Sequence, residues 1–143
     1  MMLPKNNYKH QRKMKRLLLT AVFIISSSMA WTSADLMLPA EVCSEIGANS
    51  NQCTEKQVNA KFVDLNNDGI KELITDWGGG SCGSQYYVFK LDGSIKWKLI
   101  GNWCGCETGV TRIGKTTHNK YLDIFTCGVS GFFDGNKYVG VRQ

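Results

Sequence analysis

The stretch that most constrains the fold is a run of oxygen-bearing side chains at residues 64–72, set between short apolar runs at 62–63 and 73–74. Apolar pairs on both sides of a short polar loop are typical of two strands joined by a turn. An EF-hand loop would instead be flanked by helices and would need a Glu at its twelfth position, where this chain has Thr75. The sequence therefore predicts a strand, a tight loop and a second strand.

The pattern inside this loop suits Ca²⁺, which takes about six to eight oxygen ligands. Side-chain oxygens stand at alternate positions in Asp64, Asn66 and Asp68, and Gly69 permits the sharp turn that follows. Ile70 would offer its main-chain carbonyl, and Glu72 closes the loop with another carboxylate. A metal-free turn is the alternative, because Asn, Asp and Gly also form turns by themselves.

Residues 62–74 resemble the FG-GAP or VCBS-type repeat of integrin alpha-chain propellers and many bacterial secreted proteins. In that family a D-x-[DN]-x-D-G-x-x-[DE] loop joins two strands of a propeller blade and holds Ca²⁺. The family has Asp more often at the last position, and this chain has a single copy, so a complete propeller is not implied. The resemblance implies that the ion is held by the side chains of Asp64, Asn66, Asp68 and Glu72 and by the main chain of Ile70.

The first 34 residues have the composition of a targeting segment. Six basic residues precede a nine-residue apolar run at 17–25, and small residues follow at 26–30. We predict a signal peptide cleaved after Ala30 or Ala34, with Met14 as an alternative start. The apolar run falls far short of the ~20 residues that span a bilayer, which disfavours a retained anchor. A single domain is then expected at 35–143, in the periplasm or secreted.

Removal of this segment changes the charge balance. The whole chain has 17 basic and 12 acidic residues, and residues 1–34 hold six of the basic ones and none of the acidic ones. The remainder has 11 basic and 12 acidic residues, which gives a net charge of −1. This balance gives no indication of nucleic acid or an anionic membrane as partner.

All six cysteines lie after the predicted cleavage sites, and an even number in a small exported domain predicts three disulfides. The short loop between Cys43 and Cys53 favours that pair. The other two bridges are left open among the remaining cysteines: Cys82, Cys104, Cys106 and Cys127. Such bridges would stabilise a small core by restricting the unfolded chain.

The rest of the pattern predicts an all-β domain. A short helix is expected at 38–46, where Gly47 would end it. From residue 57 onward, short runs of alternating polarity are separated by turn residues, such as Asp92-Gly93. Strands are expected at 60–65, 71–76, 85–91, 94–100, 109–113 and 121–126, with a closing hairpin at 132–139. The prediction is a small, disulfide-braced antiparallel β domain with hairpins like those of a propeller blade.

A glycine-rich loop at 77–84 follows the second of these strands. It lacks the Lys that a phosphate-binding loop carries after its last glycine, which favours a flexible loop held by a disulfide at Cys82. Loops on rigid scaffolds often carry binding residues. We take four residues as candidates for partner contact, with core packing as the alternative for the two tryptophans: Trp77, Gly79, Ser81 and Trp103.

Other catalytic chemistry has little support in the sequence. His118 stands in a polar turn, no G-x-S-x-G motif occurs, and Cys104 and Cys106 do not have the spacing of a C-x-x-C redox pair. We therefore expect an exported, non-catalytic calcium-binding domain that binds a protein or an envelope glycan, for instance as an inhibitor or immunity protein. The alternatives are an envelope hydrolase or thiol-active enzyme, and a repeat unit that acts as an oligomer because one blade leaves open edges.

Overall fold

The computed structural model describes residues 35–143 except for 79–80, 82, 94 and 107–110. The chain divides into two units, Met1–Thr32 and Ser33–Gln143. The predicted signal peptide at 1–34, including both cleavage sites, lies outside the described residues. Every helix and strand named below belongs to the second unit.

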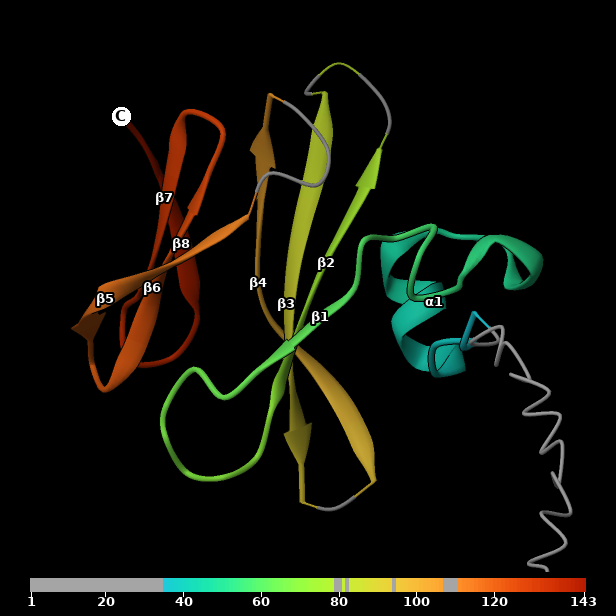
Figure 1. The fold of residues 1–143 in the computed structure, drawn as a ribbon, viewed down its shortest axis with the longest axis horizontal. Helices are drawn as coiled ribbons and strands as arrows, with labels where there is room; N and C mark the ends of the chain where they lie inside the picture. The colour runs from blue at the N-terminus through green and yellow to red at the C-terminus, as the bar shows by residue number, and fades with distance from the viewer. Residues whose placement is uncertain (1–34, 79–80, 82, 94, 107–110) are drawn as a thin grey trace, which may run out of the picture. The chain divides into compact units, whose positions relative to one another are not determined.

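Within the described residues, eight strands form one curled sheet with the order β1-β2-β3-β4-β8-β7-β6-β5 (Figure 1). Neighbouring strands are antiparallel, except that β4 and β8 are parallel. The predicted all-β class is therefore confirmed. The strands are β1 (Lys61–Val63), β2 (Glu72–Gly78), β3 (Ser84–Asp92), β4 (Lys96–Gly105), β5 (Arg112–His118), β6 (Tyr121–Thr126), β7 (Val129–Phe133) and β8 (Tyr138–Arg142).

A short helical segment precedes the sheet. It consists of α1 (Ala40–Ile46) and the 3-10 helix η1 (Ser50–Gln52). Helix α1 lies within the predicted range, and Gly47 ends it with a left-handed backbone at φ 70°. A disulfide joins Cys43 of α1 to Cys53, which follows η1 directly, so the pairing predicted from the short loop is confirmed.

The curl of the sheet produces two apolar clusters, one on each face of β2 and β3. Along β2, Ile74 faces the first cluster and Leu73 the second, which explains why this strand is buried without alternation. The first cluster contains Leu65, Ile74, Tyr86, Val88, Ile100, Trp103, Ile124, Val129, Phe133 and Tyr138. The second brings α1 and its neighbours against the sheet and contains Leu38, Val42, Cys43, Ile46, Cys53, Val58, Leu73 and Phe89.

Glycines allow the two halves of the sheet to meet along β4 and β8. The ladder between these strands consists of one pair, Gly101 with Tyr138. A Cβ on Gly101 would overlap the Cβ of Tyr138, so a larger residue would force the strands apart. Trp103 packs in the same way against Gly131 and Gly140, which are paired across β7 and β8.

The curl also brings β1 and the loop after it against β6 and the segment before β5. The N–H of Leu122 donates to the carbonyl of Leu65 at 2.7 Å. The ammonium of Lys61 donates to the carbonyl of Thr111 at 3.0 Å. The loop that follows β1 is thereby held against β6, which lies more than fifty residues later in the chain.

Candidate calcium loop and neighbouring sites

Residues 64–72 link β1 to β2 and form the tight strand-to-strand loop that the sequence predicts. Val63 pairs with Glu72, so the loop starts and ends at the same position of the ladder. Asn67 has φ 59° and Gly69 has φ 87°. Glycine and asparagine adopt this left-handed backbone more readily than other residues, which accounts for their place in the sequence.

The polar side chains of the loop turn inward onto its own main-chain amides. The carboxylate of Asp64 accepts the N–H of Asp68 at 3.2 Å and that of Gly69 at 2.9 Å. Asn66 accepts the same Asp68 N–H at 3.1 Å, and its amide donates to the Asp68 carboxylate at 2.7 Å. Asp68 in turn accepts the N–H of Ile70 at 2.7 Å. The loop thus gathers three predicted side-chain ligands into one hydrogen-bonded network.

Glu72, the fourth predicted side-chain ligand, is a buried carboxylate. It is 3% exposed, and its Oε2 accepts the N–H of Leu65 at 2.8 Å. Burial raises the pKa of Glu72; the Leu65 hydrogen bond opposes this shift, and the negative charges of Asp68 and Asp64 add to it. Among the described residues, no Lys, Arg or His nitrogen lies within 4.0 Å of these three carboxylates. Negative charge therefore gathers here without an ion pair to a described protein cation, Lys71 of the same loop included.

The donor set suits calcium chemically, although its three carboxylates do not form a metal-binding group in this structure. Carboxylates, the Asn66 amide oxygen and the Ile70 carbonyl are the hard ligands that Ca²⁺ prefers. Over the described ranges, however, no three His, Cys, Asp or Glu side chains form a group that could hold a metal ion. The amide nitrogen of Asn66 donates to the Asp68 carboxylate and to the hydroxyl of Tyr121 on β6, the latter at 3.1 Å, while the amide oxygen accepts the Asp68 N–H. Uptake of an ion would require the carboxylates of Asp64, Asp68 and Glu72 to turn toward a shared centre, and the contact of the Asn66 nitrogen with Tyr121 is compatible with that change.

The four candidates for partner contact have different environments. Trp77 is half-buried and packs against the second apolar cluster. Ser81 is exposed and lines a cavity of about 460 Å³ near Arg142, whereas Gly79 lies outside the described residues. Trp103 is 7% exposed, and its indole N–H donates to the Thr126 hydroxyl at 3.1 Å. Trp103 is therefore a core residue, which is the alternative role predicted for it from the sequence, and not an exposed contact residue.

The described cysteines contain no free thiol. A disulfide joins Cys106, just after β4, to Cys127, just after β6, across a sequence separation of 21. Cys104 is also disulfide-bonded, and Cys82 lies outside the described residues. The cysteines seen in the structure thus brace the fold.

No sequence motif predicts the polar cluster on β5 and β6. Asp123 is 1% exposed; it accepts a hydrogen bond from the Thr116 hydroxyl, and its Oδ1 lies 2.6 Å from Nδ1 of His118. The His118 side chain is 53% exposed, and its ring centre lies 4.7 Å from that of Phe132. A buried carboxylate thus orients a half-exposed imidazole, and the Asp123 charge has two partners.

An irregular ladder brings this cluster together. Residues 114–116 of β5 stand opposite Asp123 alone, and a bulge of this kind re-aims the side chains of an edge strand. One feature of the sequence could have indicated that His118 and Asp123 lie close together: they stand on either side of a turn at 119–120. In the structure both residues of this turn have positive φ. The bulge itself has no local signature.

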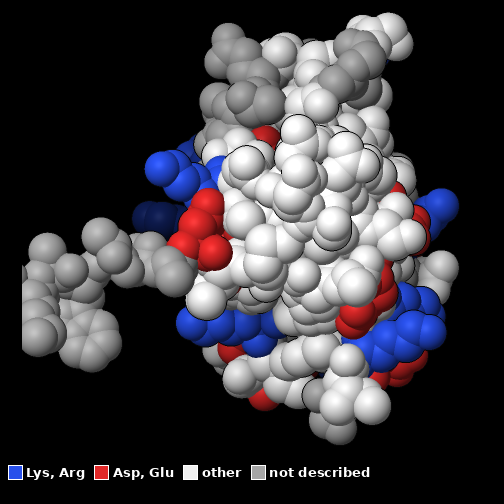
Figure 2. Space-filling model, turned by 90° about the vertical axis from the view of Figure 1, so that its right-hand side faces the viewer, with Lys and Arg blue, Asp and Glu red and all other residues white. Residues whose placement is uncertain are grey.

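The side of the domain on which α1 lies is largely uncharged at its centre (Figure 2). A cavity of about 380 Å³ beside the helix is lined by small and apolar residues that include Met37 and Leu38. Leu36 and Met37 are 60% and 55% exposed. The residues that line this cavity include no charged side chain.

Comparisons with protein families, with curated proteins and with solved structures found no match for this chain. The resemblance to FG-GAP and VCBS repeats therefore rests on residues 62–74 alone. No helix within the described ranges combines the length and the apolar character that a membrane crossing requires.

Proposed function

We propose that this protein is an exported, non-catalytic binding module whose 64–72 loop takes up a structural Ca²⁺. The observation that carries the proposal is the buried Glu72 carboxylate: burial raises its pKa, and the negative charges of Asp68 and Asp64 add to the shift. A buried carboxylate is costly unless an opposite charge compensates it. A divalent cation would supply that charge when bound.

A bound ion would act through the contacts between the 64–72 loop and β6. Asn66 contacts Tyr121, and Leu65 accepts a hydrogen bond from Leu122, so ordering of the loop would stiffen its attachment to β6. Calcium would then act on the fold rather than on a substrate. The ion would be held by the side chains of Asp64, Asn66, Asp68 and Glu72 and by the carbonyl of Ile70.

Two observations support export to the periplasm or the medium. Residues 1–34 have the composition of a signal peptide. The disulfides Cys43–Cys53 and Cys106–Cys127 are typical of an oxidising compartment. In that setting a compact, braced domain suits an inhibitor or immunity protein, and its partner would be a protein or an envelope glycan.

Thermal unfolding in calcium, in magnesium and in chelator tests the calcium site. At a hundredfold excess over Kd, calcium should stabilise the native state by about 2.7 kcal/mol, which raises Tm by about 10 °C for a domain of this size. Asp64→Ala should abolish the rise, whereas Glu45→Gln, which removes an exposed acid from α1, should keep it. A parent protein that melts equally in calcium and in chelator would remove calcium from the proposal.

A further inference from the structure

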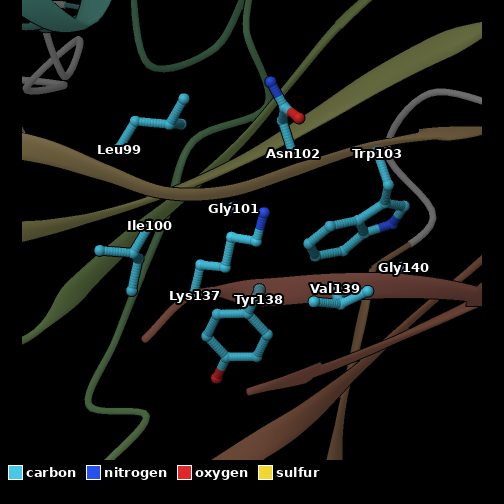
Figure 3. Close-up of a pocket in the computed structure, with 9 residues that line it drawn as sticks. All are labelled: Leu99, Ile100, Gly101, Asn102, Trp103, Lys137, Tyr138, Val139 and Gly140. Atoms are coloured by element: carbon cyan, nitrogen blue, oxygen red, sulfur yellow. The ribbon is translucent and has the colours of Figure 1, made fainter. Parts of the chain in front are cut away.

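A surface groove runs between β4 and β8, where the two halves of the sheet meet (Figure 3). Its volume is about 370 Å³. The ladder between these two strands has one residue pair, Gly101 with Tyr138. On either side of this pair the strands are no longer paired with each other. We define the β4–β8 groove by Leu99, Asn102, Lys137 and Val139. We propose that this groove binds an acidic, extended segment of a partner protein.

The residues around the groove combine one cation, one amide and two apolar side chains. Lys137 and Asn102 are exposed, and within the described part of the chain neither side chain forms a hydrogen bond or an ion pair within 4.0 Å. The Lys137 charge interacts with the exposed carboxylate of Asp134 without such a contact. Figure 3 shows Lys137, the residue just before β8, reaching toward β4, with Asn102 beyond it. Leu99 is half-buried and Val139 is 39% exposed. A carboxylate could pair with Lys137 while a neighbouring apolar side chain contacts Leu99 or Val139.

The charge of the surrounding strands favours an acidic partner. Residues 112–143 contain two acids, Asp123 and Asp134, and Asp123 is buried. Asp134 accepts the main-chain N–H groups of Asn136 and Lys137 at 2.8 and 2.9 Å. The basic residues of this segment are all exposed: Arg112, Lys115, Lys120, Lys137 and Arg142. This half is therefore positive on its surface, although residues 35–143 together have a net charge of −1.

The shape of the groove favours an extended chain. Its two long sides are strands, β4 and β8, that run in the same direction. An extended peptide alternates main-chain donors with acceptors and places alternate side chains on opposite sides, which matches walls built from strands. The cavity beside α1 lacks a charged residue and offers no such match.

The inference rests on the proposed role as a binding module but not on calcium. Binding at Lys137 can be measured in chelator, whereas the calcium-dependent rise in Tm reports on residues 64–72. A failure of one measurement therefore leaves the other unaffected.

Fluorescence anisotropy with the purified protein tests the groove. The probe is a short fluorescein-labelled peptide of alternating glutamate and valine, and a peptide of alternating lysine and valine is the comparison. The glutamate peptide should bind, and the lysine peptide should not. Lys137→Gln should weaken binding about tenfold, the effect of losing one charge-assisted hydrogen bond. Lys120→Gln removes the same charge from the same half without lining the groove and should change affinity less than about twofold.

Amide chemical shifts locate the bound peptide independently of the variants. The signals of Gly101, Asn102 and Val139 should move on addition of the glutamate peptide. Shifts confined to the α1 side, equal affinity of the Lys137→Gln and Lys120→Gln proteins, or absence of binding would overturn the proposal. Tighter binding of polygalacturonate than of the peptide would also overturn it and would point to an anionic glycan.

Discussion

The Glu72→Gln substitution should act in opposite directions with and without calcium. Glutamine keeps the shape of the side chain and can still accept the Leu65 N–H, which Glu72 accepts at 2.8 Å. It removes one negative charge from a buried position beside Asp64 and Asp68. Without calcium, that removal should leave the variant at least as stable as the parent at neutral pH, because no repulsive buried charge remains.

The pH dependence follows from the direction of the pKa shift. Burial raises the pKa of Glu72 above its ordinary value of 4.5. The Glu72 carboxyl group therefore binds its proton more tightly in the native state than in the unfolded state. The contribution of Glu72 to stability is therefore present at low pH and is lost as pH rises through the raised pKa. In chelator, the parent should lose this contribution as pH rises from about 4.5 through the raised pKa of Glu72, and Glu72→Gln should not.

Calcium should reverse the order of the two proteins. At a hundredfold excess over Kd, the parent should gain about 2.7 kcal/mol, or about 10 °C in Tm, and the variant should gain much less because it lacks one carboxylate ligand. Thermal unfolding of both proteins, with and without calcium, measures all four cases, and repeating it at a second pH tests the pH dependence. A variant that is less stable than the parent in chelator, or one with an undiminished calcium response, would refute the reasoning.

Three further substitutions test the fold around the loop. Gly101→Ala should lower the free energy of unfolding by about 1–3 kcal/mol in urea titrations, because a Cβ there overlaps Tyr138; unchanged stability would contradict the tight approach of β4 and β8. His118→Ala removes one of two partners of buried Asp123 and should cost about 1 kcal/mol in the same assay, since solvent screens the half-exposed imidazole; no loss would argue against the pairing. Replacing both Cys106 and Cys127 by Ser should cost about 3 kcal/mol, measured against reduced and oxidised parent, and a loss confined to tenths of a kcal/mol would show that this link constrains little.

Features set by local sequence were predictable. The 64–72 loop, the turn at 92–93 and the Cys43–Cys53 pair each depend on residues that are close together in the chain. Helix α1 and its end at Gly47 follow from the same local rules. The structure places all of these within or next to their predicted ranges.

Features set by distant contacts were not predictable from one sequence. Trp103 comes just after the strand predicted at 94–100 and lies close to glycine and cysteine in the sequence. Its burial, however, depends on contacts with Gly131 and Gly140, which are distant from it in the sequence. The parallel pairing of Gly101 with Tyr138 likewise has no local signal. The same holds for the bulge that directs His118 toward Asp123, because bulges arise from pairing rather than from composition.

Calorimetric titration of the oxidised protein with calcium tests the central claim most directly. We expect saturable uptake of a single ion per chain, loss of that uptake in Asp64→Ala, and weak or no response to magnesium, which demands a stricter octahedral geometry. No heat of binding at millimolar calcium, or the same uptake in Asp64→Ala as in the parent, would contradict the claim that residues 64–72 form a calcium site.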